Sequence, residues 1–301
     1  MKLSFKQRNA LILTIISWPL FFIFTCMLTN LSAFDFCPDV RGLPRILLFL
    51  FVSLLASIVT VFACGFSKHV KAQNEIMDEY ETNGLTDRFI LLSQNEIYSM
   101  INMNNKQRRK KTYAIYANYV MQLVNAYLLR RDLPGARQAV SLLPLQEMKE
   151  MMDITKAFYS NTYQFYFDIH MNICELANDV NGAQYVMREA EALNAKFQGR
   201  SPVFDLATLE TYAYYYMIMG RFDDAIACAE RCFAYRQKFP KATFIGEALY
   251  TKILQKQFRI AEAFEHLHKA KALADNPAYR QMTEQLEREL TAAQQNANVS
   301  G

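Results

Sequence analysis

Residues 209–225 read LETYAYYYMIMGRFDDA, and this stretch decides the fold of the second half of the chain. Its apolar and aromatic run predicts a helix, Gly220 marks a turn, and a second helical run begins after it. Ala213 and Ala225 are small enough for the two helices to approach closely, and Tyr216 fills the space beside that contact. The stretch therefore predicts a helical hairpin.

The turn and the alanine that follows it recur along the chain. Asp132–Ala136 (DLPGA) is echoed 47 residues later by Asp179–Ala183 (DVNGA), and then by Gly220–Ala225 (GRFDDA). A fourth, weaker copy is centred on Ala261 or Ala263. Periods of this length are typical of stacked helical hairpins, in which each pair covers the apolar face of its neighbour. About four such pairs are predicted, with no strand.

This pattern resembles a tetratricopeptide-repeat array over residues 112–275, although other helical-hairpin repeats share parts of it. The resemblance implies an all-α superhelix. The open end of such a stack needs a polar cover, and a capping helix within residues 276–301 is expected to supply it through Gln281–Gln295, with a disordered tail from Asn296. It also implies that polar positions on the first helix of each pair line a concave groove for a protein or peptide. In this sequence those positions are Asn118, Asn125, Asp168, Asn172, Glu175, Glu210, Tyr214 and Lys252.

Two uncharged stretches near the N-terminus predict a membrane anchor. They run from Asn9 to Phe34 and from Ile46 to Ser67. About 20 apolar residues in a helix cross a hydrocarbon core of about 30 Å, so residues 1–67 are predicted to form a transmembrane helical hairpin. The alternative is a signal peptide cleaved after Ala33, but its apolar region would be shorter than this one.

Basic residues set the expected orientation of the hairpin, because they resist translocation. They stand before the first span and after the second: Lys2, Lys6, Arg8, Lys68 and Lys71. Both termini are therefore expected in the cytoplasm, in a plasma membrane of bacterial type, with only residues 35–45 outside.

Residues 68–111 are predicted to be a helical linker. A first helix should end at Asn83–Gly84, and a second, capped by Thr86 or Asp87 and ending near Met103, is expected to pack on the array rather than on the membrane. A basic run follows, which could contact anionic lipid headgroups or serve only as a topology signal. Its members are Lys106, Arg108, Arg109, Lys110 and Lys111.

The sequence offers little catalytic chemistry. It has no glycine-rich phosphate loop, zinc-protease motif or nucleophile elbow. Cys228 and Cys232 could form half of a metal site, but no second Cys or His pair accompanies them, so they are interpreted as core thiols. Residues 112–301 hold 20 basic and 21 acidic residues, which argues against a nucleic-acid-binding face. No enzyme activity, cofactor or metal is predicted.

The expected function is that of a membrane-anchored cytoplasmic scaffold that binds a protein or peptide partner in the groove. Two alternatives remain open. The chain could be a structural subunit of a larger transport or secretion complex, or a regulator that senses a peptide. Self-association is compatible with all three.

Overall fold

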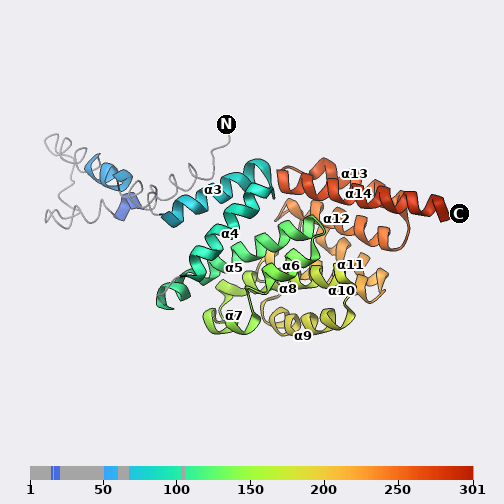
Figure 1. The fold of residues 1–301 in the computed structure, drawn as a ribbon, viewed down its shortest axis with the longest axis horizontal. Coiled ribbons are helices and arrows are strands. Elements are labelled where there is room, and N and C mark those ends of the chain that lie inside the picture. The colour runs from blue at the N-terminus through green and yellow to red at the C-terminus, as the bar shows by residue number, and fades with distance from the viewer. Residues whose placement is uncertain (1–14, 16, 21–50, 60–67, 103–105, 301) are drawn as a thin grey trace. The chain divides into compact units, whose positions relative to one another are not determined.

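The computed structural model describes residues 15, 17–20, 51–59, 68–102 and 106–300 (Figure 1). The chain forms two compact units, Met1–Glu81 and Thr82–Gly301. In the part described, every regular element is a helix and no strand occurs, so the all-α prediction is confirmed.

In the first unit, short pieces of the two apolar stretches pack through hydroxyl groups. Ser17 hydrogen-bonds Ser57 through their hydroxyls, and Trp18 Nε1 donates to Ser53 Oγ at 3.0 Å. Ser53 and Ser57 are fully buried, whereas Phe51 nearby is exposed. The remainder of both stretches lies outside the described residues. Within the described ranges, no helix combines the length and the apolar character needed to cross a membrane.

The linker helices begin and end close to where the sequence predicted. Helix α3 spans Lys68–Asn83, and Gly84 follows it with a φ of 81°. Helix α4 spans Asp87–Ile101, and the Thr86 side chain caps it by accepting a hydrogen bond from the Phe89 amide. Phe89 and Ile97 are buried, and α4 packs against α5, as expected from its apolar face.

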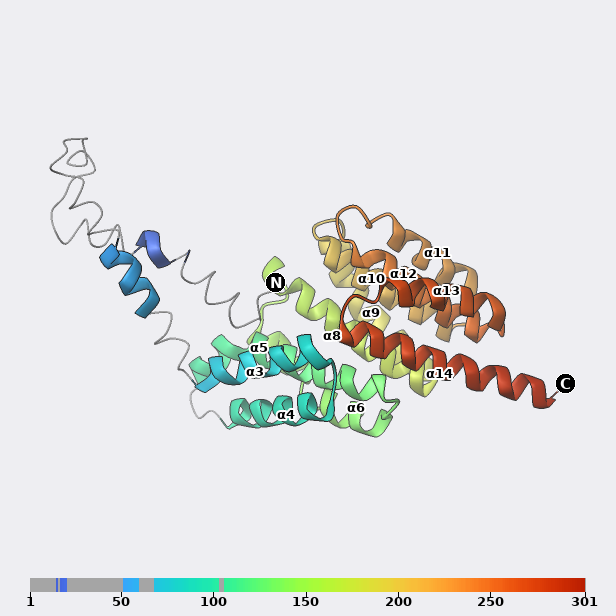
Figure 2. The same ribbon diagram turned by 90° about the horizontal axis from the view of Figure 1, so that it is seen from above.

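Four helical hairpins build the body of the second unit, and their neighbouring helices lie side by side (Figure 2). The pairs are α5 (Lys106–Leu129) with α6 (Leu133–Val140), α8 (Ala157–Ala177) with α9 (Val180–Phe197), α10 (Pro202–Ile218) with α11 (Phe222–Phe233), and α12 (Lys241–Lys256) with α13 (Ile260–Leu273). The short helix α7 (Leu145–Met151) is inserted between the first two pairs, which accounts for the longer first period.

The four turns share one backbone geometry. In each, a residue with positive φ follows the first helix, and the next amide donates to the carbonyl five residues before it at 2.8–2.9 Å. The residues with positive φ are Arg131, Asn178, Gly220 and Phe258. Five residues after each comes a fully buried alanine, namely Ala136, Ala183, Ala225 and Ala263. The fourth repeat therefore follows Ala263 and not Ala261, which is exposed, and the body is an α-solenoid.

Aspartates cap the second helix at the first two turns. Asp179 Oδ1 accepts from the Gly182 amide at 2.9 Å. A Cβ on Gly182 would lie 2.5 Å from Asp179 Oδ2, so the glycine leaves room for the cap. Replacing Asp179 by Ala should lower the free energy of unfolding by about 1 kcal/mol. Replacement by Asn, which can also cap a helix, should preserve most of the wild-type stability. Urea unfolding followed by circular dichroism measures both, and equal losses would contradict the capping role.

Phe258 occupies the fourth turn with a φ of 59° and is 82 % exposed. A left-handed conformation costs an ordinary L-residue about 1–2 kcal/mol, but Asn tolerates it. Phe258→Asn should therefore raise stability by about 1 kcal/mol, because no packing is lost. The reciprocal change Asn178→Phe at the equivalent position should lower it by a similar amount. Thermal unfolding of the two variants checks the pair, and a loss of stability in Phe258→Asn would refute the strain.

Helix α14 (Pro277–Ser300) covers the last hairpin. Its Leu286 and Leu290 are buried with Leu254 and Leu267 of α12 and α13 in one apolar cluster. The capping helix is thus present, and it continues beyond Asn296, where a disordered tail was expected.

Candidate functional site

Polar side chains from the first helices of three hairpins converge in the second unit. Helix α10 packs against both α8 and α12. At the common surface lie Asp168 and Glu175 from α8, Glu210 and Tyr214 from α10, and Lys252 from α12, which are named here the inner polar site. Residues separated by four or seven positions, such as Asp168 and Glu175, share one face of a helix, so each helix presents its polar residues in one direction.

Lys252 occupies the centre of the site. Its Nζ donates to the Tyr214 hydroxyl at 2.8 Å and lies 4.6 Å from the centre of that ring. Its charge also acts on Asp168 and Glu210, whose pKa values it lowers against the opposing effect of burial. Burial in turn lowers the pKa of Lys252 itself, since a charged ammonium loses hydration there. The charge of one lysine therefore acts on two carboxylates.

Lys252 compensates only part of the negative charge of Asp168 and Glu210. Burial raises the pKa of Asp168 to about 7, in spite of Lys252 and a 3.4 Å hydrogen bond from Thr211 Oγ1. Burial and the charge of Asp168 raise the pKa of Glu210 to about 8. Two carboxylates in mutual repulsion tend to share a proton, so the pair holds about one negative charge near neutral pH. Both residues remain partly exposed.

Glu175 has a contrasting environment. Its Oε1 accepts from Lys256 Nζ at 2.8 Å, and its Oε2 lies 3.9 Å from Arg131 Nη1. Although burial acts to raise the pKa of Glu175, the charges of Lys252, Lys256 and Arg131 outweigh it and lower that pKa. Glu175 therefore remains ionised at neutral pH as part of an ion-pair network.

Helix α14 closes one side of this surface by contacting the first turns of the unit. Arg131 forms a bidentate ion pair with Glu289, with Nε at 2.6 Å from Oε1. Gln281 accepts from the Leu85 amide at 2.8 Å and donates to the Asn83 carbonyl at 3.0 Å. The second unit thus brings residues about 200 positions apart in the sequence into contact.

Six of the eight sequence-predicted groove residues lie at or beside the inner polar site. Asn172 is among them, but it donates to its own helix, at 3.0 Å to the Asp168 carbonyl. Asn118 and Asn125 are exposed on α5, and neither hydrogen-bonds the described residues of the site. The side chains of the basic run, Lys106, Arg108, Arg109, Lys110 and Lys111, lie outside the described part of the chain.

Sequence reasoning missed Arg131, Thr211 and Lys256, which contact members of the inner polar site, and Glu289, which pairs with Arg131. Lys256 stands four positions after Lys252, one helical turn along the same face, and this spacing was an available signal. Arg131 and Glu289 are 158 residues apart, and no local pattern pairs them.

Other reactive groups are buried and engaged. Cys228 and Cys232 are free thiols in the interior, and Cys232 Sγ lies 3.4 Å from the Cys228 carbonyl. Burial raises the pKa of Cys228 to about 11, so its thiolate is scarce at neutral pH. Over the residues that the structure describes, no three His, Cys, Asp or Glu side chains are arranged to hold a metal ion. His266 is half-buried, and its Nδ1 lies 2.6 Å from Glu247 Oε2.

Comparison with known proteins adds no family: no family model matches this chain, and neither a curated protein nor a solved structure is significantly similar to it.

Proposed function

We propose that the chain is a membrane-anchored scaffold that binds a protein or peptide partner at the inner polar site, through a lysine or arginine side chain of that partner. The carboxylate pair Asp168 and Glu210 carries the proposal. These side chains are partly exposed, and a single lysine, Lys252, acts to lower both of their pKa values. Burial nevertheless keeps these pKa values near neutral, so a further positive charge would stabilise the ionised carboxylates. An incoming ammonium or guanidinium would displace the shared proton and form charge-assisted hydrogen bonds with both.

The array is proposed to be of the tetratricopeptide type. Support comes from the four turns of one geometry, each followed by a buried alanine that permits close helix contact. In such arrays the first helices of successive pairs face the concave side, which agrees with the polar residues that α8, α10 and α12 contribute.

The first 67 residues are proposed to anchor the chain as a transmembrane hairpin, with both termini in the cytoplasm. The contacts Ser17–Ser57 and Trp18–Ser53 support this assignment. Small and hydroxyl residues between helices, with apolar side chains such as Phe51 and Leu55 outside, are the arrangement that lipid favours.

Co-purification from solubilised membranes tests the binding site. The variant Asp168→Asn with Glu210→Gln keeps the shape of both side chains but removes their charge, so partner recovery should fall at least about tenfold. The matched control is Glu262→Gln, which removes an exposed carboxylate paired with Arg259. Unchanged partners in the double variant would refute the site, and equal loss in the control would show a general charge effect instead.

A second experiment separates the scaffold from a structural subunit of a membrane complex. Residues 1–67 are replaced by an unrelated hairpin of the same topology. A scaffold retains its partners after this exchange, because the inner polar site is intact. A subunit that assembles through its hairpin loses them, and that result would overturn the proposal.

A further inference from the structure

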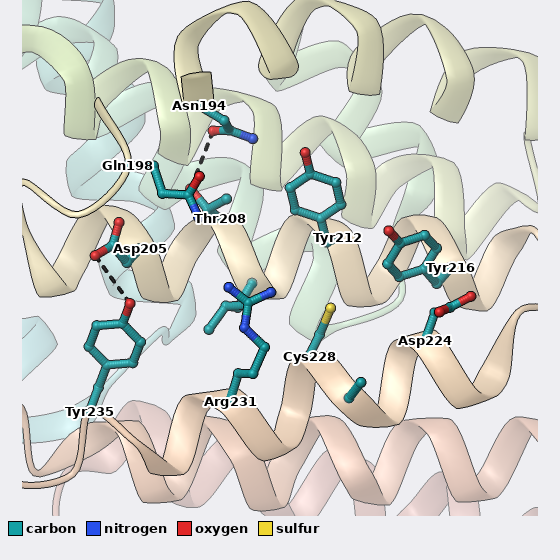
Figure 3. A pocket seen from close by; sticks show the side chains of 12 residues that line it. Asn194, Gln198, Asp205, Thr208, Tyr212, Tyr216, Asp224, Cys228, Arg231 and Tyr235 are labelled. Atoms are coloured by element: carbon teal, nitrogen blue, oxygen red, sulfur yellow. Dashed lines mark hydrogen bonds between the residues drawn. The ribbon is translucent and has the colours of Figure 1, made fainter. Parts of the chain in front are cut away.

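A cavity of about 340 Å³ lies on the face of α10 opposite to the inner polar site (Figure 3). Its floor is a stripe along α10 that includes Asp205, Thr208, Tyr212 and Tyr216, spaced by three or four residues. Glu210 and Tyr214 follow Thr208 and Tyr212 by two positions each, which turns them about 200° around the helix and away from the cavity. Helix α10 therefore separates two distinct polar regions.

The cavity contains a buried hydrogen-bond donor with no acceptor. Asn194, on α9, is 4 % exposed. Its Oδ1 accepts a 3.3 Å hydrogen bond from Thr208 Oγ1, but among the described residues its Nδ2 has no partner. A buried amide donor left unpaired is destabilising, so a ligand that supplies an acceptor there would recover that free energy.

A positively charged side chain, Arg231 of α11, also lines this cavity. Figure 3 shows the Arg231 guanidinium, from α11, extending over α10 opposite to Asn194. No described carboxylate forms an ion pair with Arg231. The two acidic side chains in the lining are already engaged, since Asp205 accepts from the Gly199 amide and the Tyr235 hydroxyl, and Asp224 pairs with Arg221.

Aromatic rings complete the lining. The rings of Tyr212 and Tyr216 lie 5.9 Å apart at 32° to one another, and Tyr235 stands at one end of the cavity. Such rings accept the flat face of a planar group, while the donors Asn194 and Arg231 select a group that only accepts. The volume matches the lower end of the range for small-molecule sites, about 300–1,000 Å³.

We infer that this cavity, named here the α9–α11 cavity, binds a small organic acid with a planar ring, whose carboxylate is held by Arg231 and Asn194. The site is independent of the inner polar site and of the function proposed for it. Ligand binding there would join α9 and α11, which belong to successive hairpins.

Fluorine NMR of the full-length protein in detergent tests the assignment, with para-fluorophenylacetate as the probe. Saturable broadening of the fluorine signal is expected with the wild-type protein. Arg231→Gln should weaken binding at least about tenfold, because the guanidinium contributes charge-assisted hydrogen bonds to the carboxylate. The control Arg236→Gln removes a nearby exposed arginine that does not line the cavity, and it should bind like the wild type. Partition of the probe into micelles is the same for all three proteins.

The neutral amide of the same probe, para-fluorophenylacetamide, tests the charge requirement and should bind at least about tenfold more weakly than the acid. Three results would overturn the inference: no saturable binding of the acid to the wild type, equal binding of the acid to Arg231→Gln, or equal binding of acid and amide. Because Arg231 is exposed and pairs with none of the described carboxylates, its replacement should leave the fold intact, which circular dichroism verifies.

Discussion

Replacing Lys252 by Met is expected to cost the second unit about 2–3 kcal/mol of stability at pH 8. The methionine keeps most of the side-chain volume but removes the charge that acts on both Asp168 and Glu210. Removing one partner of a fully buried ion pair costs roughly 3–5 kcal/mol. The smaller figure is expected here because Lys252 retains solvent contact and acts on the two carboxylates through its charge rather than through a direct ion pair with either. For a body of this size the midpoint of thermal unfolding should fall by roughly 5–10 °C.

Lys256→Met is the matched control for this result. Lys256 pairs with Glu175, which keeps the charges of Arg131 and Lys252 nearby. Its loss should cost less, about 1 kcal/mol, because the Lys256 side chain is exposed and the buried Glu175 keeps the other two positive charges. Combining Lys252→Met with Asp168→Asn and Glu210→Gln should restore most of the lost stability, because no uncompensated carboxylate remains. Equal losses in the two single variants, or no recovery in the triple variant, would contradict the central role of Lys252.

Between pH 6.5 and 8.5 the wild-type protein is expected to lose stability as the pH rises. The pKa values of Asp168 and Glu210 are raised to about 7 and about 8 in the folded state, from ordinary values of 3.8 and 4.5. In this window the folded state therefore binds more protons than the unfolded state, and the free energy of unfolding falls with increasing pH. The expected loss is about 1–2 kcal/mol once the solvent contact of both carboxylates is taken into account.

The double variant Asp168→Asn with Glu210→Gln should be nearly insensitive to pH over this range and more stable than the wild type at pH 8.5. Urea unfolding at the two pH values measures both differences. His170 does not interfere, because burial lowers its pKa to about 4, so it is neutral throughout the window. A wild-type protein whose stability rises with pH would refute the raised pKa values. Since the double variant gains stability at pH 8.5, any partner it loses there is not lost through unfolding.

The sequence alone was sufficient for the local structure of the second unit. The recurring phrase around Asp132, Asp179 and Gly220 predicted the hairpin turns, because a cap, a glycine and a small residue act over a few positions along one chain segment. For the same reason, Gly84 predicted the C-terminus of α3, and Thr86 predicted the N-terminus of α4. Helical periodicity placed Asp168 and Glu175 on one face of α8.

Tertiary structure decided which of those faces meet and how tightly. Asn125 and Tyr214 hold equivalent positions in the sequence pattern, six residues before the turn residues Arg131 and Gly220, yet only Tyr214 joins the inner polar site. Arg131 contacts Glu289 because the small rotation between each hairpin and the next accumulates along the solenoid until α14 reaches the first turns. Local sequence propensities do not determine this accumulated rotation. The α9–α11 cavity likewise depends on how far two neighbouring pairs separate, a distance that the packing of whole helices determines.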